Sequence, residues 1–231
     1  MKSDTEEFWD DIWATMEHPF GDYDELLEEH TKSLKPGRAL DLGCGSGGNA
    51  VWLAGRGWRV TAVDFSSVAI EKAKQRAADN QVEVEFIASD VTVYRPHELY
   101  DLITSFYIQL WPEQRAQMLS AAVEALAPGG RLLFVSHDQS SPPSGWSRED
   151  LESLTTPDQV AAELHGLRIE RAEVVEETGA HAVEMPPSEL PEELDSHEHR
   201  HHSQEEVDYD SPLHGATTLV VGVKDEAPAS S

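Results

Sequence analysis

Short apolar runs recur along this chain, and most of them are bounded by glycine, proline or acidic residues. Runs of this length with these boundaries are typical of buried strands. The run at residues 167–176 instead alternates apolar and polar positions, as a half-exposed strand does. The predicted strands cover residues 38–41, 58–64, 82–88, 100–107, 131–136, 167–176 and 217–224.

Apolar residues recur at helical spacing in other segments, most of which lie between these runs. Asp22 and Ser66 are the expected N-caps of the second and fourth helices, and Pro112 and Pro157 are expected in the first turns of the last two. The alternation of strands and helices predicts an α/β fold with a doubly wound, mostly parallel sheet. The predicted helices cover residues 4–17, 23–33, 49–55, 68–79, 112–127 and 157–164.

Composition divides the chain into parts. Residues 1–33 are predicted to form an N-terminal helical cap, residues 34–224 the main domain and residues 225–231 a short tail. Within the main domain, residues 179–215 are acidic, contain four prolines and have little apolar content. Because such a composition does not support a packed core, we expect a long, mobile insertion between the last two strands.

Three features favour a cytoplasmic protein. No apolar run approaches the roughly 20 residues that a membrane-spanning helix needs. The first residues lack the apolar region of an export signal. Cys44 is the single cysteine, so an internal disulfide is excluded.

The formal net charge of −27 is concentrated in the flanks of the chain. Residues 31–148 contain 12 acidic and 12 basic residues, whereas residues 1–30 carry a net charge of −10 and residues 149–210 a net charge of −16. Recognition of phosphates needs a basic surface, so neither nucleic acid nor an anionic membrane is an expected partner. The expected partner is a small molecule, and the oligomeric state is left open.

A glycine-rich turn follows the first strand, in the segment Asp41-Leu-Gly-Cys-Gly-Ser-Gly-Gly48. Glycine tolerates positive φ and has no Cβ, so this backbone can approach a ligand closely. The spacing of Gly43, Gly45 and Gly48 fits the dinucleotide fingerprint, which is a weak signal when it stands alone. The carboxylate of Asp41 would repel a pyrophosphate but would attract the ammonium and sulfonium groups of S-adenosylmethionine.

Two further acids end the next two strands. Asp64 follows the second strand and can accept both hydroxyls of a ribose, which NAD and S-adenosylmethionine share. Asp90 follows the third strand and can accept the adenine amino group, while the N–H of Val91 donates to the ring. Three acids at successive strand ends, beside a glycine loop, predict an adenosine-cofactor site at the carboxyl edge of the sheet.

Four segments resemble the ordered motifs of class I S-adenosylmethionine-dependent methyltransferases. They are Asp41-Leu-Gly-Cys-Gly-Ser-Gly, Val63-Asp64-Phe-Ser, Ala88-Ser-Asp90-Val and Leu126-Ala-Pro-Gly-Gly-Arg-Leu-Leu-Phe. Two others, Phe8-Trp9-Asp10-Asp11-Ile12-Trp13 and Val135-Ser-His137-Asp138, look most like the tellurite-resistance-like group of small bacterial methyltransferases. The resemblance covers about residues 8–180 and 216–224. Many members have a histidine where this chain has Gln109.

The resemblance implies a Rossmann-like fold with strand order 3-2-1-4-5-7-6 and an antiparallel seventh strand. It also implies S-adenosylmethionine as cofactor, S-adenosylhomocysteine as product and a small-molecule methyl acceptor. We expect the glycine loop to hold the methionine end of the cofactor and Phe65 to pack on the adenine. The predicted cofactor-binding residues are Asp41, Gly43, Cys44, Gly45, Gly47, Asp64, Phe65, Asp90, Val91 and Ser105.

Methyl transfer is an in-line displacement at an activated carbon, so the enzyme mainly has to align the two reactants. A soft or ionised acceptor, with sulfur, selenium, tellurium or oxygen as nucleophile, needs no general base. For an acceptor that holds its proton, His137 is the predicted base because an imidazole titrates near neutral pH. Asp138 either orients this histidine or begins the next turn. Trp9, Trp13 and Tyr107 are expected to line the acceptor pocket.

The segment His197-Glu-His199-Arg-His201-His202 is a weak candidate for metal binding, because imidazoles at alternate positions can bind Zn, Ni or Cu. Structural metal sites usually draw their ligands from separated segments, so no metal is predicted. Two other functions are left open: an NAD-dependent oxidoreductase, and a S-adenosylmethionine-binding module without catalysis.

Overall fold

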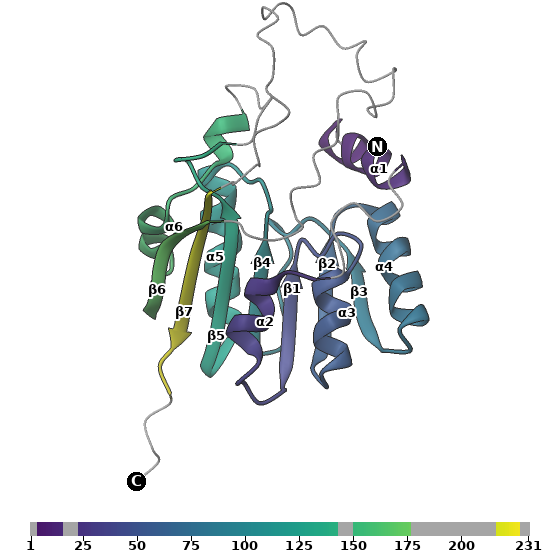
Figure 1. The fold of residues 1–231 in the computed structure, drawn as a ribbon, viewed down its shortest axis with the longest axis horizontal. Coiled ribbons are helices and arrows are strands. Elements are labelled where there is room, and N and C mark those ends of the chain that lie inside the picture. Colours follow the sequence, from purple (N-terminus) through teal and green to yellow (C-terminus); the bar gives the residue numbers. More distant parts are fainter. Residues whose placement is uncertain (1–3, 16–22, 143–149, 177–215, 227–231) are drawn as a thin grey trace, which may run out of the picture.

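The computed structural model describes residues 4–15, 23–142, 150–176 and 216–226, and these form one seven-stranded sheet flanked by helices (Figure 1). The strand order is β3-β2-β1-β4-β5-β7-β6. β7 pairs antiparallel with β5 and with β6, and the remaining pairs are parallel. The predicted fold class and strand order are therefore confirmed. The strands are β1 (Arg38–Leu42), β2 (Arg59–Asp64), β3 (Val84–Ala88), β4 (Tyr100–Phe106), β5 (Leu126–His137), β6 (Leu167–Glu176) and β7 (Ala216–Lys224).

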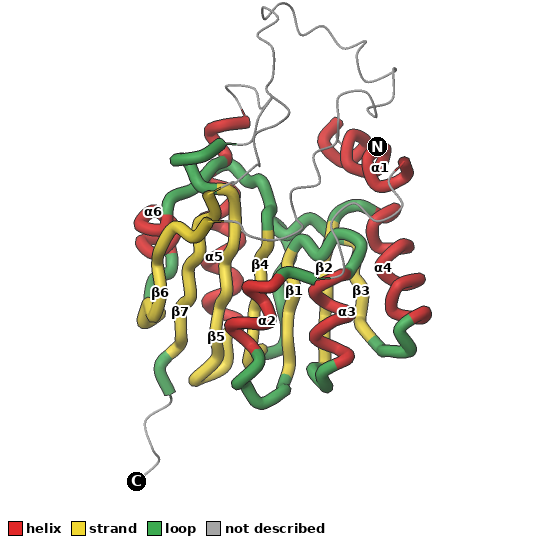
Figure 2. Tube along the Cα trace, in the orientation of Figure 1, coloured by secondary structure: helices red, strands yellow, loops and turns green. Residues whose placement is uncertain are grey.

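Helices cover both faces of the sheet, as Figure 2 shows. On one face, Leu27 of α2, Trp52 of α3 and Ile70 of α4 share a buried cluster with the strands. On the other face, Met118 of α5 and Val160 of α6 belong to a second cluster. The helices are α1 (Asp4–Thr15), α2 (Glu25–Thr31), α3 (Gly48–Gly55), α4 (Ser67–Asp79), α5 (Pro112–Ala125) and α6 (Pro157–Glu163), with a short 3₁₀ turn at Asp150–Ser153.

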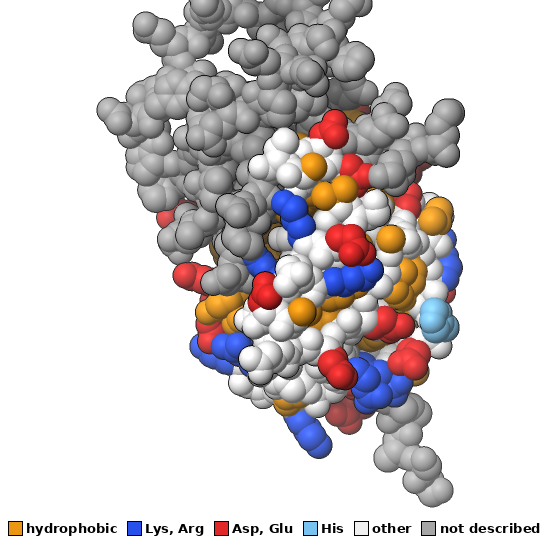
Figure 3. All heavy atoms as spheres, turned by 90° about the vertical axis from the view of Figure 1, so that its right-hand side faces the viewer, with side chains coloured by type: hydrophobic (Ala, Val, Ile, Leu, Met, Phe, Trp, Pro, Cys, Tyr) orange, Lys and Arg blue, Asp and Glu red, His pale blue; other side chains and the backbone are white. Residues whose placement is uncertain are grey.

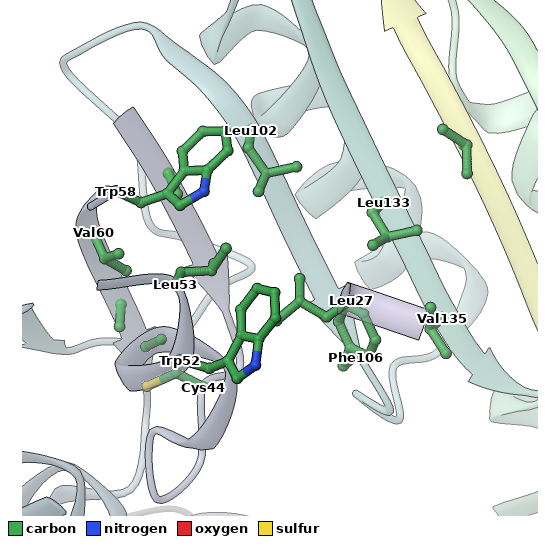
Figure 4. Packing of buried hydrophobic residues seen from close by; sticks show 14 of the residues in the cluster. Leu27, Cys44, Trp52, Leu53, Trp58, Val60, Leu102, Phe106, Leu133 and Val135 are labelled. Atoms are coloured by element: carbon green, nitrogen blue, oxygen red, sulfur yellow. The ribbon is translucent and has the colours of Figure 1, made fainter. Parts of the chain in front are cut away.

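The two clusters follow from the strand periodicity, because successive side chains of a strand point to opposite faces. In β1, Ala39 lies in the α3 cluster and Leu40 in the α5 cluster. Figure 4 shows side chains of α3, such as Trp52, in one cluster with strand residues such as Leu102 and Leu133. Since both faces are covered, the central strands are apolar almost throughout their length.

Two predicted boundaries were wrong by two residues each. The N-cap of α2 is Asp24, not Asp22, because the Asp24 carboxylate accepts the Leu26 N–H at 2.8 Å. β3 begins at Val84 because the N–H of Val82 still donates to Ala77 O at the end of α4. The predicted N-cap of α4 is confirmed, since Ser66 Oγ accepts the Ala69 N–H at 3.1 Å.

Residues Pro128-Gly129-Gly130 separate the predicted helix at 112–127 from the predicted strand at 131–136, but they lie inside β5, which starts directly after α5 at Leu126. Leu126 pairs with Tyr100, and the register then shifts before Arg131 pairs with Leu102. A Cβ on Gly130 would lie 2.9 Å from Tyr100 O, so the irregular entry into β5 requires a glycine there.

α1 lies beyond the carboxyl ends of the strands, next to α4 (Figure 1). α2 differs from α1, because its Leu27 is fully buried in the core beside α3. The division into a cap at residues 1–33 and a domain at 34–224 remains a prediction. The predicted insertion at 179–215 lies outside the described residues. No helix in the described part of the chain is long and apolar enough to cross a membrane.

Candidate active site

The loop after β1 has the backbone that the glycine pattern predicts. Gly43, Gly45 and Gly47 have φ values of +70°, +50° and +80°, which residues with a Cβ rarely adopt. The N–H groups of Gly43 and Cys44 both donate to Val63 O, at 2.8 and 3.0 Å, and thereby tie the loop to the end of β2. The loop then runs directly into α3, with Gly47 as its N-cap.

Side chains from distant segments pack onto this loop where a Cβ would otherwise stand. A Cβ on Gly45 would lie 2.8 Å from the indole ring of Trp13, and one on Gly43 would lie 2.4 Å from Ile108. Trp13 belongs to α1 and is buried. The structure thus places Trp13 directly at the loop that the sequence assigned to the cofactor.

Asp41 lies in β1 under the loop and is only 2% exposed. Its Oδ1 accepts a 2.8 Å hydrogen bond from Thr104 Oγ1 of β4, and its buried Oδ2 has no hydrogen-bond partner among the described residues. Burial raises the pKa of the Asp41 carboxyl to about 7; the hydrogen bond from Thr104 opposes this rise and the charge of Asp64 adds to it. An ionised Asp41 would therefore be stabilised by a cation placed at Oδ2.

Asp64 ends β2 and is 6% exposed. Its two oxygens accept the N–H of Gly45 at 2.8 Å and the N–H of Ser66 at 2.9 Å. Burial raises the pKa of Asp64, the backbone N–H groups of Ser66 and Gly45 lower it, and the charge of Asp10 raises it. The carboxylate therefore joins the glycine loop of β1 to the start of α4.

Asp10 of α1 is a member of this site that the sequence did not assign. It is 7% exposed and accepts a hydrogen bond from the hydroxyl of Ser66, the N-cap of α4. Trp13 lies one helical turn further along the same helix and covers Gly45. α1 therefore brings a carboxylate and an indole to the ends of β1 and β2. The only available signal was the Phe8-Trp9-Asp10 motif, in which Trp9 is half-buried.

The other predicted cofactor residues lie along the same edge of the sheet. Asp90 is exposed and accepts the N–H and the hydroxyl of Thr92, both at 2.8 Å, so it shapes the turn after β3. Val91 is buried and Phe65 half-buried. Ser105 of β4 is buried, and its hydroxyl has no partner in the described segments.

The predicted acceptor residues Tyr107 and His137 meet at the ends of β4 and β5. Their ring centroids lie 5.0 Å apart with an interplanar angle of 45°. Tyr107 has a φ of +52°, and its N–H donates to Val135 O at 2.8 Å. The left-handed conformation of a bulky residue marks this turn as constrained by its surroundings. Beside Tyr107, Ile108 reaches Gly43, so this turn also contacts the glycine loop.

Asp138 begins the next turn, which was one of its two expected roles. Its oxygens accept from the N–H and hydroxyl of Ser140, at 2.8 and 2.6 Å, and from Thr218 Oγ1 at 2.6 Å. Burial raises its pKa, but the hydrogen bonds from Ser140 and Thr218 outweigh this and the pKa is lowered. Asp138 is therefore an ionised structural residue.

Neither a cysteine nucleophile nor a metal centre emerges from the described residues. Burial, then the charges of Asp64 and Asp41, raise the pKa of the Cys44 thiol well above its ordinary value, so it stays protonated. No group of three or more His, Cys, Asp or Glu side chains within the described segments could hold a metal ion. The candidate metal-binding residues His197, His199, His201 and His202 lie outside those segments.

The site thus combines a glycine-rich loop with three buried carboxylates, those of Asp10, Asp41 and Asp64. Asp41 Oδ2 and Ser105 Oγ, two buried oxygens without a hydrogen-bond partner in the described segments, lie on neighbouring strands. This donor set fits a cationic ligand that carries hydroxyl groups, and it does not fit a pyrophosphate.

Residues 39–130 match a family model described as a methyltransferase domain. The chain is similar to N-methyltransferase NodS of Bradyrhizobium japonicum in complex with S-adenosyl-L-homocysteine, with a TM-score of 0.67 and 20% identity over 97% of this chain and 100% of that one. Residues 39–130 of this chain thus match a methyltransferase domain. The class I resemblance is thereby confirmed, whereas the tellurite-resistance-like subgroup remains a prediction.

Curated relatives are similar to parts of this chain. Thiocyanate methyltransferase 1 of Arabidopsis thaliana is 36% identical over 107 residues, which are 45% of this chain and 47% of that protein. Ribosomal RNA small subunit methyltransferase C of Alcanivorax borkumensis is 30% identical over 152 residues, which are 64% of this chain and 45% of that protein. The chain thus spans about half the length of these relatives. Because one of them is named for RNA, the expected exclusion of nucleic acid stays a prediction.

Proposed function

We propose that this protein transfers the methyl group of S-adenosylmethionine to a small-molecule acceptor, a soft or ionised nucleophile with sulfur, selenium, tellurium or oxygen as the attacking atom. The observation that carries the proposal is the buried Asp41 carboxylate, whose Oδ2 has no hydrogen-bond partner among the described residues and which lies under a glycine loop. The similarity to a thiocyanate methyltransferase supports a sulfur nucleophile.

The chain's own residues would hold the cofactor at the carboxyl edge of the sheet. Asp41 would face the ammonium group, Asp64 the ribose hydroxyls, and Phe65 with Asp90 and Val91 the adenine. When bound, S-adenosylmethionine supplies a methyl group on a positively charged sulfur, which is already activated for displacement. The protein then has to orient the acceptor and exclude water, and α1 with the buried Trp13 covers the loop where this happens.

Tyr107 and His137 would form the acceptor side of the site. Their rings pack together at the ends of β4 and β5, and Ile108 next to Tyr107 contacts the glycine loop. If the methyl acceptor still carries its proton, the imidazole would take that proton as a general base. If the methyl acceptor is already ionised, the imidazole would only orient it. An aromatic face also favours a cationic sulfur over water.

The surface supports a small acceptor. On the side of the molecule that carries α4 and β3, Figure 3 shows basic, acidic and apolar side chains interspersed among the described residues. A phosphate backbone would be met there by charges of both signs. We also propose a cytoplasmic location, which rests on the single cysteine of the sequence.

The proposal is tested first by calorimetric titration with S-adenosylmethionine, S-adenosylhomocysteine and NAD(H), followed by a methyl-transfer assay with hydrosulfide and thiocyanate as acceptors. We expect micromolar binding of the first two compounds, no binding of NAD(H), and methylated product from at least one acceptor. Binding of NAD(H) alone would replace the proposal with an oxidoreductase. Binding of S-adenosylmethionine without turnover of any acceptor in a wider screen would favour a non-catalytic module.

Replacing Asp64 by alanine is expected to weaken binding of S-adenosylmethionine by about 1.5–3 kcal/mol, because hydrogen bonds from the ribose to a carboxylate are lost. Calorimetry at pH 8 measures the change. Asp79→Ala is the matched control, since Asp79 lies at the exposed end of α4 and should leave the affinity unchanged. An unchanged affinity in Asp64→Ala would overturn the ribose assignment.

A further inference from the structure

His137 has a direct neighbour across the sheet that the proposed function does not use. In the antiparallel pairing of β5 with β7, His137 lies opposite Thr217. The next pair, Asp138 with Ala216, is joined by a 2.9 Å bond from Asp138 N–H to Ala216 O. Because hydrogen-bonded and non-hydrogen-bonded pairs alternate, His137 and Thr217 form a non-hydrogen-bonded pair, in which side chains on the shared face lie closer together.

Thr217 carries a hydroxyl group with no hydrogen-bond partner among the described residues, although the residue is 0% exposed. The adjacent Thr218 points to the other face of the sheet, and its hydroxyl donates to Asp138 and to Thr155 O. A buried hydroxyl without a partner is unfavourable, so each one calls for an explanation. Since solvent does not reach Thr217, a neighbouring side chain can supply the missing partner.

Of the two described residues that lie opposite Thr217 in the sheet, one is polar. On β6 the residue opposite Thr217 is Val175, which is apolar, and on β5 it is His137. Tyr107 follows β4, the neighbour of β5 opposite to β7, and its ring packs against the imidazole. The left-handed backbone of Tyr107 and its N–H bond to Val135 O hold this ring in place. His137 therefore has the aromatic ring that follows β4 on one side and, across the strand pair, Thr217 of β7 on the other.

We propose that Thr217 is a positioning residue for His137: its hydroxyl pairs with one imidazole nitrogen when the ring turns from Tyr107 toward β7. This rotation about side-chain bonds leaves the strand pairing intact. This hydrogen bond would fix the tautomer of the imidazole and direct the other ring nitrogen toward the methyl acceptor. In other proteins, a hydrogen bond to one ring nitrogen orients a functional histidine in the same way. The proposal rests on the assignment of His137 to the acceptor site.

The test is the ¹⁵N NMR spectrum of the full chain with labelled histidine, saturated with S-adenosylhomocysteine. His137→Gln identifies the His137 signals by their loss. In the unaltered protein we expect two well-separated ring-nitrogen signals from a single tautomer. In Thr217→Val, which keeps the side-chain shape, they should shift toward the averaged position of mixed tautomers, and Thr217→Ser should restore them.

Thr218→Val is the matched control, because it removes a hydroxyl from the same strand on the opposite face of the sheet. Its His137 signals should stay in place. Identical His137 signals in Thr217→Val and the unaltered protein would overturn the proposal, and so would an equal shift in Thr218→Val. Because the readout needs no methyl acceptor, it stands apart from the turnover assay that tests the proposed function.

Discussion

Asp41→Asn is expected to stabilise the free protein at pH 8 and at the same time to weaken its binding of S-adenosylmethionine about 10- to 150-fold. The asparagine retains an oxygen that accepts the hydroxyl of Thr104, as Asp41 Oδ1 does now at 2.8 Å. It removes a charge that is buried and that no described residue pairs at Oδ2. The same change removes the carboxylate that would face the ammonium group of the cofactor.

The sign of the stability effect follows from the pKa of Asp41. Burial raises this pKa to about 7, above the value of about 3.9 for an aspartate in an unfolded chain. The folded state therefore binds more protons than the unfolded state between these two pH values, and the stability of the free protein falls as pH rises through this window. Above it, Asp41→Asn should recover on the order of 1–4 kcal/mol.

Urea unfolding of both proteins without cofactor, at pH 5 and pH 8, measures this effect. The difference in unfolding free energy should be large at pH 8 and small at pH 5, where Asp41 is itself close to neutral. Calorimetry should show a wild-type affinity for S-adenosylmethionine that rises between pH 6 and pH 8, and a flatter profile for the variant. Equal destabilisation by Asp41→Asn at both pH values would mean that the carboxylate is stabilised in the free protein.

The cofactor end of the site could be predicted because its signals are local in the sequence. Asp41 and Asp64 each lie at the end of an apolar run, and the carboxyl ends of neighbouring parallel strands meet at one edge of the sheet. The structure brings the glycine loop and the end of β2 together, since the Gly45 N–H of the loop donates to Asp64 at 2.8 Å. Positive φ at Gly43, Gly45 and Gly47 likewise agrees with the glycine spacing.

The rest of the site depends on hydrogen bonds between residues far apart in the sequence, which no local pattern predicts. Thr104 reaches Asp41 from 63 residues away, and Ser66 reaches Asp10 from 56 residues away. Both threonine and serine are common in strands and caps, so their types alone did not identify these partners. The same holds for Thr217, whose place opposite His137 depends on the register of β7 on β5. The register of a strand is set by the packing of the whole sheet, and a single apolar run of the sequence does not specify it.

A partly buried ion pair between α5 and α6 is a contact that the sequence did not predict. Arg115 Nε and NH2 donate to the two oxygens of Glu163, at 3.0 and 2.7 Å. The side chains are 5% and 21% exposed, so the arginine is the more deeply buried partner. Arg115 NH1 is buried and has no hydrogen-bond partner among the described residues. The positive charge of the guanidinium is therefore compensated mainly by the carboxylate of Glu163.

Glu163→Ala should therefore lower the unfolding free energy by about 2–4 kcal/mol, because it leaves the arginine charge buried and unpaired. Arg115→Met should cost less, since methionine fills a similar volume and the freed Glu163 is exposed enough to be hydrated. Urea unfolding of the two single variants and of the double variant measures the asymmetry, with the m-value as a check on the unfolded state. If Arg115→Met proved the more destabilising of the two, the arginine stem, and not its charge, would be what holds α5 against α6.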